Sequence, residues 1–138
     1  MMTNRPSVWI FDVDGTLIGS IRSTQLRPGA RELLETLTEA GTTLVLWSAG
    51  GAEYAHRMLA QFDLVHFFSG IYAKEERCER GLYRIDHIDP AHRPDTFVDD
   101  YPHEVPDTGR TIGVPQFLGG NPHDHGLKTA LEIARKQP

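Results

Sequence analysis

The sequence predicts an α/β fold in which a parallel sheet carries helices on both faces. Short runs rich in Val, Ile, Leu and aromatic residues alternate along the chain with segments whose apolar residues recur at helical spacing. Several of the runs are apolar almost throughout, as expected of strands buried on both faces of a parallel sheet. Strands that alternate with helices are joined by right-handed crossovers, which cover such a sheet with helices.

The first predicted element is a strand over residues 8–13, a nearly continuous β-favouring run that ends at Gly15. A loop punctuated by Arg27-Pro28-Gly29 follows. A helix is then predicted from Ala30 to Gly41, which suits a helix C-terminus. Its apolar positions are Leu33, Leu34, Leu37 and Ala40.

A second strand and a second helix come next. The strand is predicted over residues 43–47, and the helix begins after Gly50-Gly51 and ends before Phe62. The remaining predicted elements are extended segments at 65–68, 71–73, 96–98 and 111–114, and a closing helix over residues 125–136.

Length and composition narrow the function classes. The 138 residues, 39% of them hydrophobic, fit one domain spanning 1–138. The net charge of -5 and the scattered lysines and arginines lack the basic surface that binds nucleic-acid backbones. No apolar run approaches the roughly 18 residues of a membrane helix, so no membrane partner is expected. The single cysteine, Cys78, suits a reducing compartment, and we expect a cytoplasmic location.

Polar side chains follow three of the predicted strands: Asp12 and Asp14, then Ser48, then Asp99 and Asp100. Ligands of parallel α/β sheets bind beyond the carboxyl ends of the strands, so these residues should form one site. On a strand, Asp12 and Asp14 would project from the same face, about 7 Å apart. Bare carboxylates there are costly unless a cation compensates, and hard oxygen ligands suit Mg²⁺. A magnesium site of Asp12, Asp14, Asp99 and Asp100 is therefore predicted.

A carboxylate beside such a cation is suited to phosphoryl transfer, because aspartate forms acyl phosphates in known enzymes. Asp12 is the natural nucleophile, and Asp14 would protonate the leaving oxygen and later activate water. Ser48 ends a strand just before a helix. Its hydroxyl and the following amides, beginning with that of Ala49, would hold a phosphate oxygen.

Three segments resemble motifs of the haloacid dehalogenase superfamily of phosphohydrolases: Asp12-Val13-Asp14-Gly15-Thr16-Leu17, Ser48 after Leu44-Val45-Leu46-Trp47, and Phe97-Val98-Asp99-Asp100. The resemblance implies a Rossmann-like fold with Asp12 as nucleophile and Asp14 as general acid and base. It also implies that Thr16 positions the turn and contributes to phosphate binding. Within the superfamily the sequence is most similar to the capless phosphatases of the RNA polymerase carboxy-terminal domain, through Arg27-Pro28-Gly29, Tyr54-Ala55 and Asp99-Asp100-Tyr101-Pro102.

The third motif of the superfamily is a lysine that neutralises the phosphate. Between Ser48 and Asp99 the only lysine is Lys74, whereas in the carboxy-terminal-domain phosphatases the lysine would fall near Ile85. Lys74 or Arg84 supplies the charge, or the site is weakened. The intervals in which the superfamily inserts its cap domains are too short here for a folded cap. The open site that results suits a macromolecular substrate, such as a phosphoprotein or a nucleic-acid end, or else a partner subunit must supply the lid.

The sequence therefore predicts a magnesium-dependent phosphomonoester hydrolase that works through an aspartyl phosphate on Asp12. The alternative is a non-catalytic protein of the same fold that serves as a binding or scaffold module. The spacing of Cys78 and Arg84 matches that of cysteine-dependent phosphatases, but no buried strand leads into Cys78 and Glu79 would lie within the phosphate cradle. The pattern specifies no oligomeric state.

Overall fold

A five-stranded parallel sheet forms the centre of the structure, in the order β3-β2-β1-β4-β5. The strands are β1 (Val8–Phe11), β2 (Thr43–Ser48), β3 (Gly70–Ala73), β4 (Thr96–Asp99) and β5 (Arg110–Gly113). The computed structural model describes residues 5–137. Residues 1–4 and 138, which the predicted domain includes, lie outside this part. β1 occupies the middle of the sheet, where all four of its residues are buried.

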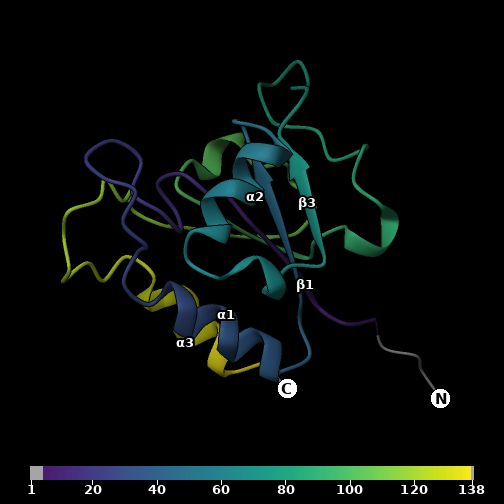
Figure 1. Ribbon diagram of the computed structural model, residues 1–138. Coiled ribbons are helices and arrows are strands. Elements are labelled where there is room, and N and C mark those ends of the chain that lie inside the picture. Colours follow the sequence, from purple (N-terminus) through teal and green to yellow (C-terminus); the bar gives the residue numbers. More distant parts are fainter. Residues whose placement is uncertain (1–4, 138) are drawn as a thin grey trace.

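The three α-helices, α1 (Ala30–Glu39), α2 (Ala52–Ala60) and α3 (Lys128–Arg135), pack on one face of the sheet. Their buried side chains join Trp9, Phe11, Leu44 and Leu46 in one core cluster. The first two crossovers run in the same direction across the sheet, so their right-handedness places α1 and α2 on the same side. α1 and α3 lie side by side (Figure 1). No helix of the described part is both long and apolar enough to cross a bilayer.

The opposite face is covered differently. From β3 at one edge, the chain must return past β1 to reach β4, and the segment between them packs across this second face. Ile88 from that segment and Val105 close a smaller core cluster over Ile10, Trp47 and Phe97. The helices here are single 3₁₀ turns, η2 (Pro90–His92) and η3 (Pro102–Glu104). Helices thus lie on both faces as predicted, but the α-helices gather on one.

Several predicted elements differ from the structure in their bounds, and three of these differences are informative. The extended segment predicted at 65–68 is wrong, because Val65–Phe67 forms a 3₁₀ helix, η1, just after Asp63 reverses the chain with a φ of 56°. The closing helix begins at Lys128 rather than at residue 125, and the Gly126 amide instead donates to the Asp124 side chain. The first strand ends at Phe11, two residues earlier than predicted.

Candidate active site

A tight turn carries Asp12 away from the end of β1. The Asp12 amide still donates to the Val98 carbonyl, at 3.1 Å, and the chain then turns back on itself, with the Leu17 amide donating to the Val13 carbonyl at 3.0 Å. Gly15 has a φ of 81°, and a Cβ there would lie 2.3 Å from an Asp100 carboxylate oxygen. Only glycine therefore fits this turn, which explains its place in the motif.

Thr16 connects the turn to the end of β4. Its hydroxyl donates to Asp12 Oδ2 at 3.0 Å and accepts from the Asp100 amide at 3.1 Å. Thr16 is fully buried, so these bonds are not exchanged for water. They hold the Asp12 carboxylate in one orientation relative to Asp100.

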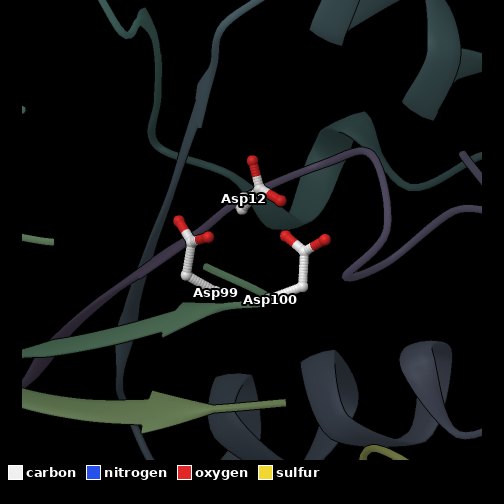
Figure 2. A group of neighbouring side chains, drawn as sticks. All are labelled: Asp12, Asp99 and Asp100. Atoms are coloured by element: carbon white, nitrogen blue, oxygen red, sulfur yellow. The ribbon is translucent and has the colours of Figure 1, made fainter. Parts of the chain in front are cut away.

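The carboxylates of Asp12, Asp99 and Asp100 converge beyond the ends of β1 and β4 (Figure 2). One carboxylate oxygen from each of the three residues lies within 4.8 Å of the other two. Within the described residues, these three side chains make up the group that lies close enough to hold a metal ion. Asp100 Oδ2 is buried and has no hydrogen-bond partner in the described part of the chain. Three hard oxygen donors, one of them unsatisfied, could hold a divalent metal ion.

Burial makes these carboxylates hard to ionise. Burial, followed by the neighbouring Asp100, raises the pKa of Asp12 to about 7, although Lys74 opposes the change. Burial and the charge of Asp12 raise the pKa of Asp99 to about 6. Burial also raises the pKa of Asp100. A divalent cation among them would favour the charged forms, and a nucleophilic carboxylate must be charged.

Lys74, directly after β3, is the basic residue that reaches this group. Its Nζ donates to Asp12 Oδ1 at 3.0 Å and to Asp99 Oδ2 at 2.9 Å, and its side chain is 6% exposed. Burial would lower the pKa of Lys74, but the two carboxylates together raise it. The ammonium also lies 5.0 Å from the ring centre of Trp47 and 5.2 Å from that of Tyr83.

Arg84, the other predicted source of positive charge, is not in the site. Its side chain is 52% exposed and pairs with Asp86 on the surface. Of the two residues, the structure therefore brings only Lys74 to the carboxylates.

Asp14 occupies a different position from the one expected of a strand residue. Because β1 ends at Phe11, Asp14 lies in the turn and is not part of the group formed by Asp12, Asp99 and Asp100. The hydroxyl of Tyr54, in α2, donates to Asp14 Oδ1 at 2.7 Å. Burial and this bond raise the pKa of Tyr54 to about 12, so the tyrosine stays a donor. Tyr54 thus bonds one carboxylate oxygen of Asp14, Oδ1, and does not bond the other.

Ser48 ends β2 and Ala49 follows it, just before α2, as predicted, and both border the same cleft as Asp12. The Ser48 hydroxyl accepts from the Gly50 amide at 3.1 Å. The Ser48 carbonyl accepts from the Lys74 amide at 2.9 Å, which joins the ends of β2 and β3. Of the predicted site residues, Asp99 and Thr16 are buried behind the cleft, and the others line it.

The cleft has a volume of about 230 Å³ and includes residues that the sequence pattern did not predict for the site. These are Ser20, Tyr83, Tyr101, Glu104 and Gln116. Tyr101 directly follows Asp99-Asp100, so strand-end reasoning could have found it. Glu104 ends η3 and the other three come from loops, so no apolar strand directly precedes any of them to mark its position.

Comparison with known proteins identifies two uncharacterized viral proteins as relatives. The chain is 34% identical over 80 residues to an uncharacterized 38.0 kDa protein of Autographa californica nuclear polyhedrosis virus, a match that covers 54% of this chain and 25% of that protein. It is also 34% identical over 70 residues to an uncharacterized 36.0 kDa protein of Orgyia pseudotsugata multicapsid polyhedrosis virus, covering 50% and 22%. The matches thus span about a quarter of the length of these relatives.

Solved structures share the fold. An uncharacterized protein from Listeria monocytogenes serotype 4b superimposes with a TM-score of 0.58 at 20% identity, covering 83% of each chain. A chain of the Pnkp1/Rnl/Hen1 complex superimposes with a TM-score of 0.63 at 17% identity, covering 84% of this chain and 48% of that one.

The family comparison covers nearly the whole molecule. The model of the NLI interacting factor-like phosphatases matches residues 8–137, which include every element from β1 to α3. The match agrees with the parallel sheet, with the absence of a cap from the described residues, and with the carboxylates at the strand ends. The chain therefore belongs to the NLI interacting factor-like phosphatases, a capless family of the haloacid dehalogenase superfamily.

Proposed function

We propose that the protein hydrolyses phosphomonoesters by transferring the phosphoryl group to Asp12, with a magnesium ion held by Asp12, Asp99 and Asp100. The observation that carries the proposal is the position of the Lys74 ammonium, within 3.0 Å of Asp12 and 2.9 Å of Asp99 at the back of an open cleft. This arrangement combines a nucleophile, an acidic metal site and a cation for the phosphate.

The first step is attack of an Asp12 carboxylate oxygen on phosphorus. A bound magnesium ion would screen the negative charge of the phosphoryl group and of the carboxylates around it. Thr16 and Lys74 each bond one Asp12 oxygen and so limit its rotation, which favours attack along one line. The bond between phosphorus and the ester oxygen breaks, and Asp14 donates a proton to that oxygen.

The second step regenerates the enzyme. Asp14, now ionised, accepts a proton from water, and the oxygen of that water attacks phosphorus. The bond between phosphorus and Asp12 breaks, which releases inorganic phosphate and returns Asp12 as a carboxylate. The bond from Tyr54 to Asp14 Oδ1 leaves the other oxygen of Asp14 for both proton transfers.

The cleft favours an extended substrate whose remainder carries little negative charge. It is lined by Asp12, Asp14, Asp100 and Glu104 against one cation, Lys74. The backbone phosphates of a nucleic acid would be repelled by this lining, so we propose a phosphoprotein as the substrate. The chain with the same fold in the Pnkp1/Rnl/Hen1 RNA repair complex makes oligonucleotide ends the alternative to test.

The test is phosphate release from an aryl phosphate, phosphopeptides and 3′- and 5′-phosphorylated oligonucleotides, each with magnesium and with chelator. We expect release from phosphopeptides that needs magnesium and is lost in Asp12→Asn and, for esters with poor leaving groups, in Asp14→Asn. Asp107→Asn is the matched control, because the Asp107 side chain is 73% exposed and pairs with Arg80 on the surface.

Trapping of the intermediate tests the mechanism separately. Denaturation during turnover should leave phosphate on the peptide that contains Asp12, and hydroxylamine should remove it because an acyl phosphate is labile to this nucleophile. Activity that survives Asp12→Asn would refute the mechanism. Magnesium binding without release from any substrate would instead favour a binding or scaffold module.

A further inference from the structure

Arg27 is a buried cation that the proposed reaction does not use. It is 1% exposed and lies near the end of the loop between the catalytic turn and α1. A guanidinium cannot lose its charge inside a protein, so its burial requires partners for its charge and its N–H groups.

Two of these partners are carbonyls of the catalytic turn. Arg27 Nη1 donates to the carbonyls of Gly15 and Thr16, both at 3.3 Å. The Gly15 carbonyl also accepts from the Phe117 amide at 2.8 Å, and the Phe117 ring lies 5.3 Å from the guanidinium carbon. One side chain, that of Arg27, therefore holds the backbone of the turn that orients Asp12 and Thr16.

The other side of the guanidinium is held by Asp124, which lies 97 residues away in sequence. Arg27 Nε donates to Asp124 Oδ2 at 2.6 Å, and Nη2 donates to Oδ1 at 3.3 Å. Burial would raise the pKa of Asp124, but the bonds from Arg27 and from the Gly126 amide hold it below its ordinary value. A Cβ at Gly126 would lie 1.7 Å from Arg27 Nη2, so the loop closes tightly around the guanidinium.

We propose that Arg27 and Asp124 form a positioning pair that connects the loop before α3 to the catalytic turn and keeps Asp12 in its reactive orientation. Arg27 acts through Gly15 and Thr16 and touches neither Asp12 nor the cleft. The connection runs from Asp124 through the guanidinium to the turn carbonyls, and from the Thr16 hydroxyl to Asp12 Oδ2. The effect on turnover rests on the proposed function, whereas the effect on the turn does not.

Arg27→Lys tests the pair, because lysine keeps the charge but lacks the planar fork that serves both partners. Asp124→Asn is the second variant, since it keeps the shape and removes the charge. Hydrogen exchange is measured at the amides of Gly15 and Leu17, whose bonds close the turn, and at those of β2 as an internal reference. Steady-state kinetics on an aryl phosphate with saturating magnesium follows at a temperature where each variant is folded.

We expect faster exchange at the turn amides, unchanged exchange in β2, and a kcat lowered by at least about tenfold with little change in KM, since misplacing a reacting group mainly slows the chemical step. Leu37→Ala is the control. Leu37 belongs to α1 and is fully buried in the core, and it forms no part of the hydrogen-bonded connection from Asp124 to Asp12. Its truncation should therefore lower stability without changing kcat per folded molecule.

Unchanged turn exchange in folded Arg27→Lys and Asp124→Asn would overturn the proposal, and so would a lowered kcat in Leu37→Ala of the same size. Failure of both variants to fold would make the pair a requirement for folding alone and would also overturn it. If the wild type releases no phosphate, the proposed function fails, and hydrogen exchange still decides whether the pair holds the turn.

Discussion

Replacing Asp12 by asparagine should inactivate the protein and at the same time stabilise its metal-free form. The wild-type Asp12 side chain is 9% exposed, and burial raises the pKa of its carboxyl group from 3.8 to about 7. The folded state therefore binds this proton more tightly than the unfolded state does. Stability is highest below the unfolded pKa and falls as the pH rises towards the folded pKa. Asparagine carries no ionisable proton and should be free of this dependence.

The size of the effect follows from the two pKa values. At about 1.36 kcal/mol for each pH unit between them, the raised pKa of Asp12 costs the folded state about 4 kcal/mol at pH 8, and about 2 kcal/mol at pH 5. The amide of the variant keeps an oxygen that can accept from Lys74, so most of the local contacts survive. We expect Asp12→Asn to raise the melting temperature in chelator at pH 8 by roughly 10 °C, and by less at pH 5.

The assay is thermal unfolding of both proteins between pH 5 and pH 8, with chelator and with magnesium. Magnesium should raise the melting temperature of the wild type much more than that of Asp12→Asn, because the ion favours the ionised carboxylate. Asp107→Asn should change neither curve. A variant less stable than the wild type in chelator at pH 8, or a difference that does not vary with pH, would contradict this account of the buried carboxyl.

Three further substitutions test the rest of the site. Lys74→Met should lower kcat/KM about 100-fold or more at saturating magnesium, because it removes the cation that faces the phosphate. A loss below about tenfold would assign that charge to another group. Tyr54→Phe removes the hydrogen bond to Asp14, the proposed acid. The kcat for an alkyl phosphate, which has a poor leaving group, should therefore fall more than the kcat for an aryl phosphate. Equal losses would show that Tyr54 does not orient the acid. Asp99→Asn should weaken magnesium binding by at least about tenfold in calorimetric titration, and unchanged affinity would remove Asp99 from the ligand set.

Much of the fold is readable from local pattern. β1 is apolar throughout and β2 over its four middle residues because both faces of each strand are covered, and such runs are recognisable without knowledge of their neighbours. The prediction of an extended segment at 65–68 is wrong because it also depends on a short apolar run. Its apolar residues pack against the core from a 3₁₀ turn, and a short apolar run does not distinguish these two conformations.

The candidate site is predictable where residues follow a strand and not where they come from loops. Asp12, Ser48 and Asp99 were expected together because parallel strands end at one edge of a sheet. The bond between Tyr54 and Asp14 was not expected, since it depends on how α2 packs against the turn. The separation of Asp14 from the other carboxylates depends on the end of β1 at Phe11, which leaves Asp14 in the turn.

The order of the elements, the parallel sheet and the set of acidic residues at its edge can be read from the chain alone, because they follow from periodicity and strand ends. The folded structure was needed to establish that Lys74 rather than Arg84 reaches Asp12, and that Arg27 lies buried behind the turn. A charge is stable inside a protein only beside opposite charges and hydrogen-bond partners. Asp12 is 62 residues from Lys74 along the chain and Asp124 is 97 residues from Arg27, so folding is what brings each cation to its partner.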